Sequence, residues 1–319
     1  MRFTRLAATI CALSLVTGLI VYGGIFLWPG LAGSAPKIMD RNNDGPRYLF
    51  SIGGVSGPVR PNAMALDKKG RVYVTDGGSG KVFVYSENGR KLAEFGHPGT
   101  GKSDFGFANG IVVTKEGNLM IADSTNNDIK VFNPDGKYLK TVLKSSDHVK
   151  PGYMSQGSDR LIYVSDLLNK QILVMDENGV KHRVVGTSEK PLSYPQGTAV
   201  DKNGMLWVAD SGNYSIRIFD AKGHQVNEIK GGGQPETPFS MLRGIAFDQT
   251  GRAFIADTIA HKIRVFNSEG KQLYTFPTSE ASKNLLIFPT TVVMGPGNKL
   301  YVVDRGAGGV RVFSVDSLK

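Results

Sequence analysis

The sequence predicts an all-β protein, a six-bladed β-propeller preceded by a single N-terminal transmembrane helix. Three observations predict it: an aspartate-terminated strand recurs six times, Gly accounts for 40 of 319 residues, and residues 6–28 carry no charge. Abundant Gly without a collagen-like period indicates many tight turns and therefore many short strands. Hydrophobic residues at 40% and charged residues at 21% are ordinary for a folded globular protein, which excludes a disordered or fibrous chain.

The uncharged segment 6–28 is long enough to cross a membrane. At about 1.5 Å per residue it would span roughly 34 Å as a helix, more than the hydrocarbon core requires. Arg2 and Arg5 precede it, so the positive-inside rule places residues 1–5 in the cytoplasm and the large C-terminal part outside. A cleaved signal peptide is the alternative, although the apolar region of such a peptide is usually about 7–15 residues. We expect a single-pass protein of the cell membrane, with the propeller periplasmic or extracellular.

Residues 29–45 are rich in Gly, Pro, Asn and charge, which predicts a flexible stalk between the anchor and the folded domain 46–319. The formal net charge is +10, of which Arg2 and Arg5 account for two, so the outer part carries +8. That charge would allow contact with an anionic membrane or wall polymer, but the Lys and Arg residues are scattered. The single Cys, Cys11, excludes a disulfide framework and a zinc site built on cysteines.

Internal repetition determines the predicted fold. A turn, an apolar strand and a closing aspartate recur at separations of 47, 43, 44, 47 and 47 residues. This period is typical of one four-stranded propeller blade per repeat. Each aspartate is followed by a short loop, an alternating strand, a Gly-containing turn and a fourth strand. The closing aspartates are Asp76, Asp123, Asp166, Asp210, Asp257 and Asp304.

The repeats cover about 61–96, 108–144, 150–186, 195–231, 242–277 and 289–315. The sixth stops after its third strand, and its missing outer strand is expected near the other end of the folded domain, in residues 47–53. There Arg47-Tyr-Leu-Phe-Ser-Ile-Gly resembles the fourth strand of the first repeat. Such an exchange closes the ring and removes the exposed edges of an open array.

Two phrases carry a family resemblance: Pro195-QGTAVDKNGMLWVADSGNYSIRIFD and Leu242-RGIAFDQTGRAFIADTIAHKIRVFN. They resemble NHL repeats, and the resemblance extends over about residues 46–315. The chain is similar to bacterial-type, membrane-anchored members of the NHL-repeat six-bladed propeller family. The resemblance implies the fold, but NHL propellers include protein-binding platforms, RNA binders, lyases and sensor domains. The third repeat departs most, because Gly152 replaces a side chain that is polar in the other repeats.

The residues that break the repeat symmetry are the best candidates for a binding site. Fourteen positions before each aspartate, the inner strand should begin beside one mouth of the central channel. Arg243 is the single charged residue of this set and would suit a carboxylate or phosphate. The alternative is that Arg243 pairs with a nearby carboxylate such as Asp257. The candidate ligand-binding residues are Asn62, Asn109, Gln196, Arg243 and Thr290.

The six aspartates are expected to be structural. An Asp that ends a strand before a Gly, Ser or Asn loop accepts backbone N–H bonds and sets the turn. A metal ring is the alternative, but repetition in every blade favours the structural interpretation. No cofactor is expected.

His97, His148 and His261 lie in loops of the same predicted face. Some NHL-like lyases bind zinc through three histidines there, so the resemblance makes a zinc or calcium site the alternative. The spacing of the three histidines contains no local ligand motif.

The preferred functional hypothesis is a binding or scaffold module that engages a protein, peptide or cell-envelope component at its channel-mouth face. The chain contains no nucleophile elbow, P-loop, zincin, EF-hand or haem-attachment motif. The alternative is an enzyme, either a metal-dependent lyase or a lactonase-like hydrolase using the same face. No nucleic-acid partner is expected, and the propeller is expected to be a monomer.

Overall fold

The computed structural model describes residues 46–54, 57–187, 191–231, 239–277, 286–316 and 318. The predicted cytoplasmic segment 1–5, anchor 6–28 and stalk 29–45 lie outside these residues. Within the described ranges, no helix is both long enough and apolar enough to cross a membrane. The chain divides into two units, residues 1–37 and 38–319, and the propeller belongs to the second.

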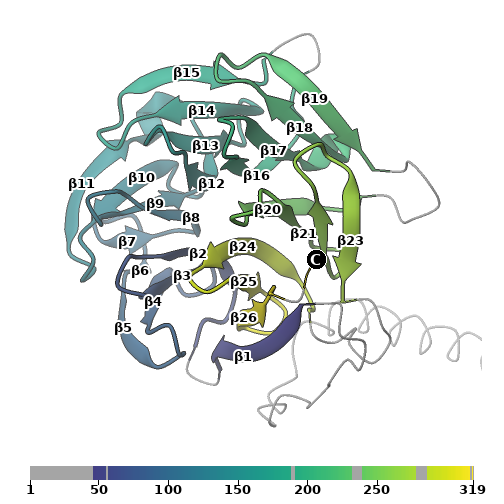
Figure 1. Cartoon of the computed structure of the whole chain (residues 1–319). Coiled ribbons are helices and arrows are strands. Elements are labelled where there is room, and N and C mark those ends of the chain that lie inside the picture. The colour runs from purple at the N-terminus through teal and green to yellow at the C-terminus, as the bar shows by residue number, and fades with distance from the viewer. Residues whose placement is uncertain are drawn as a thin grey trace, which may run out of the picture. The chain divides into compact units, whose positions relative to one another are not determined.

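Six four-stranded antiparallel sheets form the blades of a propeller, which confirms the predicted all-β fold (Figure 1). Blade 1 contains β2 (Pro61–Leu66), β3 (Val72–Asp76), β4 (Lys81–Tyr85) and β5 (Lys91–Phe95). Blade 2 contains β8 (Ala108–Val113), β9 (Leu119–Asp123), β10 (Asp128–Phe132) and β11 (Tyr138–Leu143). Blade 3 contains β12 (Pro151–Gln156), β13 (Ile162–Asp166), β14 (Gln171–Met175) and β15 (Lys181–Val185).

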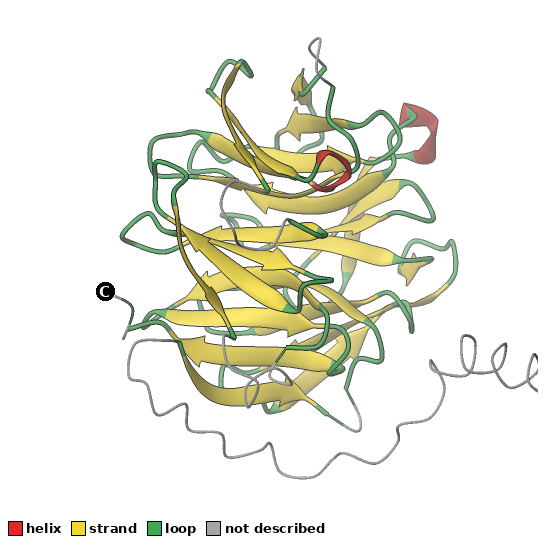
Figure 2. Ribbon diagram, turned by 90° about the vertical axis from the view of Figure 1, so that its right-hand side faces the viewer, coloured by secondary structure: helices red, strands yellow, loops and turns green. Residues whose placement is uncertain are grey.

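Blade 4 contains β16 (Pro195–Val200), β17 (Leu206–Asp210), β18 (Ser215–Phe219) and β19 (Gln225–Lys230). Blade 5 contains β20 (Leu242–Phe247), β21 (Ala253–Asp257), β22 (Lys262–Phe266) and β23 (Gln272–Phe276). Blade 6 contains β24 (Pro289–Gly295), β25 (Lys299–Asp304), β26 (Gly309–Ser314) and β1 (Arg47–Gly53). Between blades 1 and 2, β6 (His97–Pro98) and β7 (Asp104–Phe105) pair in parallel. Two single-turn 3-10 helices, η1 (Ser145–Asp147) and η2 (Ser211–Asn213), lie among the loops (Figure 2).

The two ends of the folded chain share blade 6. Strand β1 pairs antiparallel with β26, with Arg47 opposite Ser314 and Ile52 opposite Val310. Ile52 is only 1% exposed and belongs to a hydrophobic cluster that joins blades 6 and 1. This is the exchange expected for residues 47–53, and it gives β26 a neighbour that the last repeat itself does not supply.

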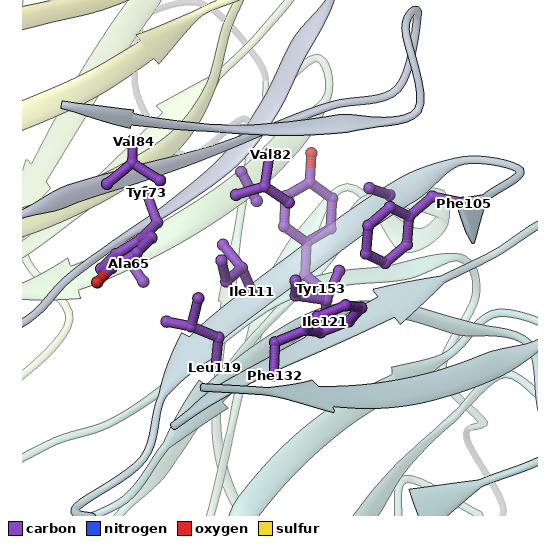
Figure 3. Close-up of a cluster of buried hydrophobic side chains, with 12 residues drawn as sticks. Ala65, Tyr73, Val82, Val84, Phe105, Ile111, Leu119, Ile121, Phe132 and Tyr153 are labelled. Atoms are coloured by element: carbon purple, nitrogen blue, oxygen red, sulfur yellow. The ribbon is translucent and has the colours of Figure 1, made fainter. Parts of the chain in front are cut away.

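The hydrophobic core lies between successive blades, where the faces of adjacent sheets pack together. The second strand is buried along its whole length in blades 1 to 5, and in blade 6 only its first residue, Lys299, is half-buried. The outer strands are largely exposed on one side. Figure 3 shows the cluster between blades 1 and 2, which includes Tyr73, Val84, Ile121 and Phe132. Tyr153 of blade 3 reaches into the same cluster. The alternating apolar pattern of the repeats therefore supplies the contacts that hold the ring together.

Every inner strand contains a β-bulge at its start. In blade 2 the pairing of the inner strand with the second strand shifts register between Ala108 and Gly110. In blade 5 it shifts between Leu242 and Ile245. The same shift occurs in the other four blades. Each shift falls on the position fourteen residues before the aspartate. A bulge redirects the side chain at the extra residue, so these positions are the ones at which the inner strands can present unusual contacts.

Candidate ligand-binding site

The six aspartates that end the second strands are all buried, with 0% exposure. Asp123 shows the pattern: its carboxylate accepts N–H bonds from Gly106 at 2.7 Å and Phe107 at 2.9 Å. It also accepts N–H bonds from Thr125 and Asn126, both at 3.0 Å. In blades 1 to 4 the carboxylate thus joins the loop after its strand to the connection that enters the same blade. The carboxylates of Asp257 and Asp304 accept N–H bonds from the entering connection. These contacts give the aspartates a structural role in the loops.

In blades 4 and 5 the carboxylate also forms an ion pair with a buried arginine. Arg264 Nε donates to Asp257 Oδ2 at 2.7 Å, and Arg217 Nη1 lies 3.4 Å from Asp210 Oδ2. All four side chains are almost completely buried. Burial is the main cause that raises the pKa of Asp210 above its usual value. The carboxylate of Asp257 is therefore already engaged by Arg264 and by the loop at Ser240.

We call the surface formed by the loops after the six aspartates and by the connections into the inner strands the aspartate-loop face. The opposite surface, formed by the turns between first and second and between third and fourth strands, is the hairpin face. The first of these carries the residues predicted to bind a ligand.

Four of the predicted ligand-binding residues are buried rather than open to solvent: Asn62 at 1%, Asn109 at 8%, Gln196 at 3% and Thr290 at 0% exposure. Asn62 Nδ2 donates to the backbone carbonyl of Asn109 at 2.9 Å. Thr290 Oγ1 donates to the backbone carbonyl of Asn62 at 2.9 Å. Asn62, Asn109 and Thr290 therefore link the inner strands of blades 6, 1 and 2, because the bulges turn them toward neighbouring strands. Among the five candidate residues, Arg243 is therefore the one that is not buried.

Arg243 differs from the other four because its side chain is partly exposed. Its Nη1 donates to Tyr153 Oη at 3.1 Å, and its Nη2 lies 3.5 Å from Met241 Sδ. Its Nε is buried and has no hydrogen-bond partner among the described residues. The alternative pairing with Asp257 is not what the structure shows, since Arg264 occupies that carboxylate. Tyr153 is the partner that sequence reasoning missed.

A signal for Tyr153 exists in the repeats. The position after the bulge holds a small residue in the five other blades: Ala63, Gly110, Gly197, Gly244 and Thr291. At Gly197 a Cβ would approach the backbone carbonyl of Arg243 to 2.1 Å, so the inner strands leave no room for a side chain there. Tyr153 occupies this position in blade 3, next to Gly152. Comparing equivalent positions of the six repeats, which distinguishes Arg243, also distinguishes Tyr153.

Several exposed apolar side chains lie on loops of the aspartate-loop face. Among the described residues, those on the aspartate-loop face are Val59, Leu168, Tyr194, Tyr214, Ile259, Ile287 and Phe288. The remaining exposed large hydrophobic residues lie on outer strands, except Val180 in a hairpin turn. Each of them offers apolar surface that a ligand on this face could remove from water.

The three histidines predicted as alternative metal ligands are exposed and have separate surroundings. His97 Nδ1 lies 4.0 Å from Asp104 Oδ1, and His261 Nδ1 contacts the carbonyl of Ile287. His261 also makes an edge contact with Phe288 at 5.2 Å between ring centroids. In the described part of the chain, no group of three or more His, Cys, Asp or Glu side chains could hold a metal ion.

Two shallow depressions, of about 430 and 290 Å³, lie on the hairpin face and not beside Arg243. Both are lined by turns between first and second strands, and Leu66 contributes to each. The residues that line the larger one include Lys68, Lys115 and Arg160. These two depressions and Arg243 therefore lie on opposite faces.

Comparison with known proteins identifies the repeat and the fold. The NHL repeat family matches residues 192–219. A solved structure of catalytically inactive virginiamycin B lyase from Staphylococcus aureus with quinupristin is similar, with 18% identity and a TM-score of 0.63. That match covers 84% of this chain and 86% of the lyase.

A putative gluconolactonase and a luciferin-regenerating enzyme are similar at 13% identity, each with a TM-score of 0.64. The matches cover 85% and 86% of this chain, and 98% and 97% of the respective proteins. At these identities the likeness extends to the fold alone. The chain has a six-bladed β-propeller fold and contains a match to the NHL repeat at residues 192–219.

Proposed function

We propose that this propeller is a binding module that engages its ligand at the aspartate-loop face, with Arg243 as a contact residue. One observation carries the proposal: Arg243 is a partly exposed guanidinium that forms no ion pair with a described carboxylate. A guanidinium has five N–H donors, and those of Arg243 are only partly used by Tyr153 and Met241. The remaining donors are available to a ligand that carries a carboxylate or phosphate.

The surroundings of Arg243 support the same face. Seven exposed apolar residues lie on its loops, and the loops differ in length and composition between blades. Variable loops on a rigid scaffold are the usual place for specificity. The hairpin face consists mainly of turns with Gly in the left-handed region, such as Gly89 and Gly136. Such turns are determined by backbone geometry and offer little side-chain chemistry.

The proposal includes the location expected from the sequence. The propeller is tethered by residues 6–28 to the cell membrane and lies on its extracytoplasmic side. Its partner is a protein, a peptide or another component of the cell envelope.

The alternative function is catalysis by a metal-dependent lyase or a lactonase-like hydrolase. It is favoured by the fold of the similar structures, one of which is a lyase and one a putative gluconolactonase. Metal analysis of the purified protein after dialysis separates the two functions. Stoichiometric zinc or calcium would favour the enzyme, and its removal should then unfold or inactivate the protein.

Site-specific photocrosslinking in the native envelope tests the binding face. A photoreactive residue replaces Tyr214, which is 58% exposed on the aspartate-loop face, or Lys222, which lies in an exposed turn of the hairpin face. The proposal predicts a discrete adduct from position 214 that Arg243→Ala weakens, and no adduct from position 222. Adducts from position 222 alone, unaffected by Arg243→Ala, would place the site on the hairpin face and overturn the proposal.

A further inference from the structure

Two further arginines lie beside Arg243 on the aspartate-loop face. Arg60 precedes β2 in blade 1, and its backbone N–H donates to Asp76 Oδ1 at 2.6 Å. Arg305 follows β25 in blade 6, and its backbone N–H donates to the backbone carbonyl of Phe288 at 2.9 Å. Blades 5, 6 and 1 are consecutive in the ring, so Arg243, Arg305 and Arg60 form one arc of the channel mouth.

The repeats mark Arg305 as an exception in the same way as Arg243. Directly after the closing aspartate, the other five blades have Gly77, Ser124, Leu167, Ser211 and Thr258. Arg305 is therefore the single charged residue at its repeat position. Arg60 shares its own position, sixteen residues before the aspartate, with Phe107, Lys150, Tyr194, Met241 and Phe288. Neither blade geometry nor turn chemistry requires an arginine at either place.

None of the three arginines forms an ion pair with a carboxylate of the described residues. Burial lowers the pKa of Arg305, and the charges of Arg60 and Arg243 lower it further. Arg305 lies in blade 6, between the blades of Arg243 and Arg60, and the positive charges of both act on its guanidinium group. Unpaired like charges held together destabilise the fold unless an anion offsets them.

We propose that Arg60, Arg243 and Arg305 form a phosphate-binding site at the channel mouth, with Tyr153 positioning Arg243. The inference rests on the proposed function and names the ligand class of that same site. A single bidentate arginine can satisfy a carboxylate, whereas three guanidinium groups suit the several oxygens and nearly two negative charges of a phosphate monoester. Tyr153 Oη accepts one N–H of Arg243 and so orients the guanidinium while leaving its other donors available.

The apolar loops around the arginines indicate the rest of the ligand. Phe288 and Ile287 enter blade 6 beside Arg305, and Val59 precedes Arg60. Their exposures are 43%, 38% and 72% respectively, so each offers apolar surface to a bound molecule. Adding an apolar group to the phosphate should therefore strengthen its binding, because the loops can remove that group from water.

Calorimetric titration of the full-length protein in detergent tests the site with two probes, inorganic phosphate and phenyl phosphate. Phenyl phosphate should bind more tightly than phosphate, and phenol should not bind. Arg305→Gln and Arg60→Gln should each weaken phenyl phosphate about tenfold or more, the scale of a lost charged hydrogen bond. Arg60 is exposed, so its variant should fold even if a variant of Arg305 does not. Arg90→Gln, an exposed arginine in a turn of the hairpin face, is the matched control and should leave affinity unchanged.

The outcomes separate the ligand class from the binding face. If the crosslinking above identifies the aspartate-loop face but neither arginine variant alters phosphate binding, the phosphate site is wrong and the proposed function remains. Benzoate binding as tightly as phenyl phosphate would also overturn the phosphate assignment, since a carboxylate would then suffice. Equal losses in the Arg60, Arg305 and Arg90 variants would indicate general attraction to a basic protein and overturn the site.

Discussion

The guanidinium of Arg243, on the inner strand of blade 5, donates a hydrogen bond of 3.1 Å to the phenol of Tyr153, on the inner strand of blade 3. The two strands are separated around the ring by the inner strand of blade 4. Tyr153 is 4% exposed, and its ring packs into the cluster between blades 1 and 2. This hydrogen bond therefore connects blades that share no sheet and orients the arginine at the channel mouth.

Removing the phenol tests this connection. Tyr153→Phe should lower the free energy of unfolding by about 1 kcal/mol, because Arg243 loses a hydrogen-bond acceptor. The control is Tyr85→Phe, since Tyr85 Oη is buried without a partner among the described residues and its removal should be neutral or stabilising. Urea unfolding of both variants gives the measurement. Equal effects in the two variants would show that the Arg243 contact contributes nothing specific.

Closure of the ring depends on the packing of β1. Ile52→Ala should lower the free energy of unfolding by about 2–5 kcal/mol, because it leaves a cavity under the strand that completes blade 6. Leu92→Ala is the control, since Leu92 lies on the outer strand of blade 1 and is 43% exposed. Thermal melting and gel filtration report the loss of stability and any aggregation through an uncovered β26. A melting temperature equal to that of Leu92→Ala would contradict the role of β1 in closure.

The buried aspartates should be needed for folding. Asp123→Ala should cost about 3 kcal/mol or more, because at least four N–H donors lose their acceptor in two loops at once. Asp135, whose side chain is 82% exposed, forms a surface ion pair with Arg71 at 3.4 Å. Asp135→Ala should therefore change stability by less than about 1 kcal/mol. Chemical unfolding compares the two, and a smaller effect at Asp123 than at Asp135 would refute the structural role.

Acid should remove the contribution of one surface cluster. Hydrogen bonds from Lys81 and then Lys91 lower the pKa of Glu94 to about 2. Its folded pKa lies below the unfolded value of about 4.3, so the cluster stabilises the fold above that pH and loses its effect as pH falls toward 2. Glu94→Gln should cost about 0.2–1 kcal/mol at pH 7, since the cluster is partly exposed. The difference from wild type in urea unfolding should shrink below pH 4, and a difference that grows in acid would contradict the assignment.

The proposed anchor has its own test. Replacing Leu15 and Leu19 with Arg should cost about 3 kcal/mol of insertion energy for each central Arg, so the variant should leave the membrane fraction. Cell fractionation followed by mass spectrometry measures the location and the mass. Release of the unaltered protein at a mass lacking about residues 1–34 would show that the segment is a cleaved signal peptide.

Much of the fold could be predicted from the sequence because its information is local and repeated. The spacing of the six aspartates, the alternating strands and the Gly-containing turns define one blade, and six copies define the number of blades. The strand that completes blade 6 was visible as well, because the last repeat lacks an outer strand and residues 47–53 resemble one. Arg243 stood out by the same comparison of equivalent positions.

The contacts at the channel mouth were decided by the tertiary structure. Asn62 and Thr290 meet although 228 residues separate them, because ring closure places the inner strands of blades 6 and 1 side by side. Tyr153 reaches Arg243 from 90 residues away, since the inner strands converge and bulge there. The pattern of one repeat contains no information on which side chains of other repeats it will face. The sequence by itself determined the blades and their order, whereas the burial of Asn62 and the unpaired charge of Arg243 followed from packing six nearly equivalent strands around one axis.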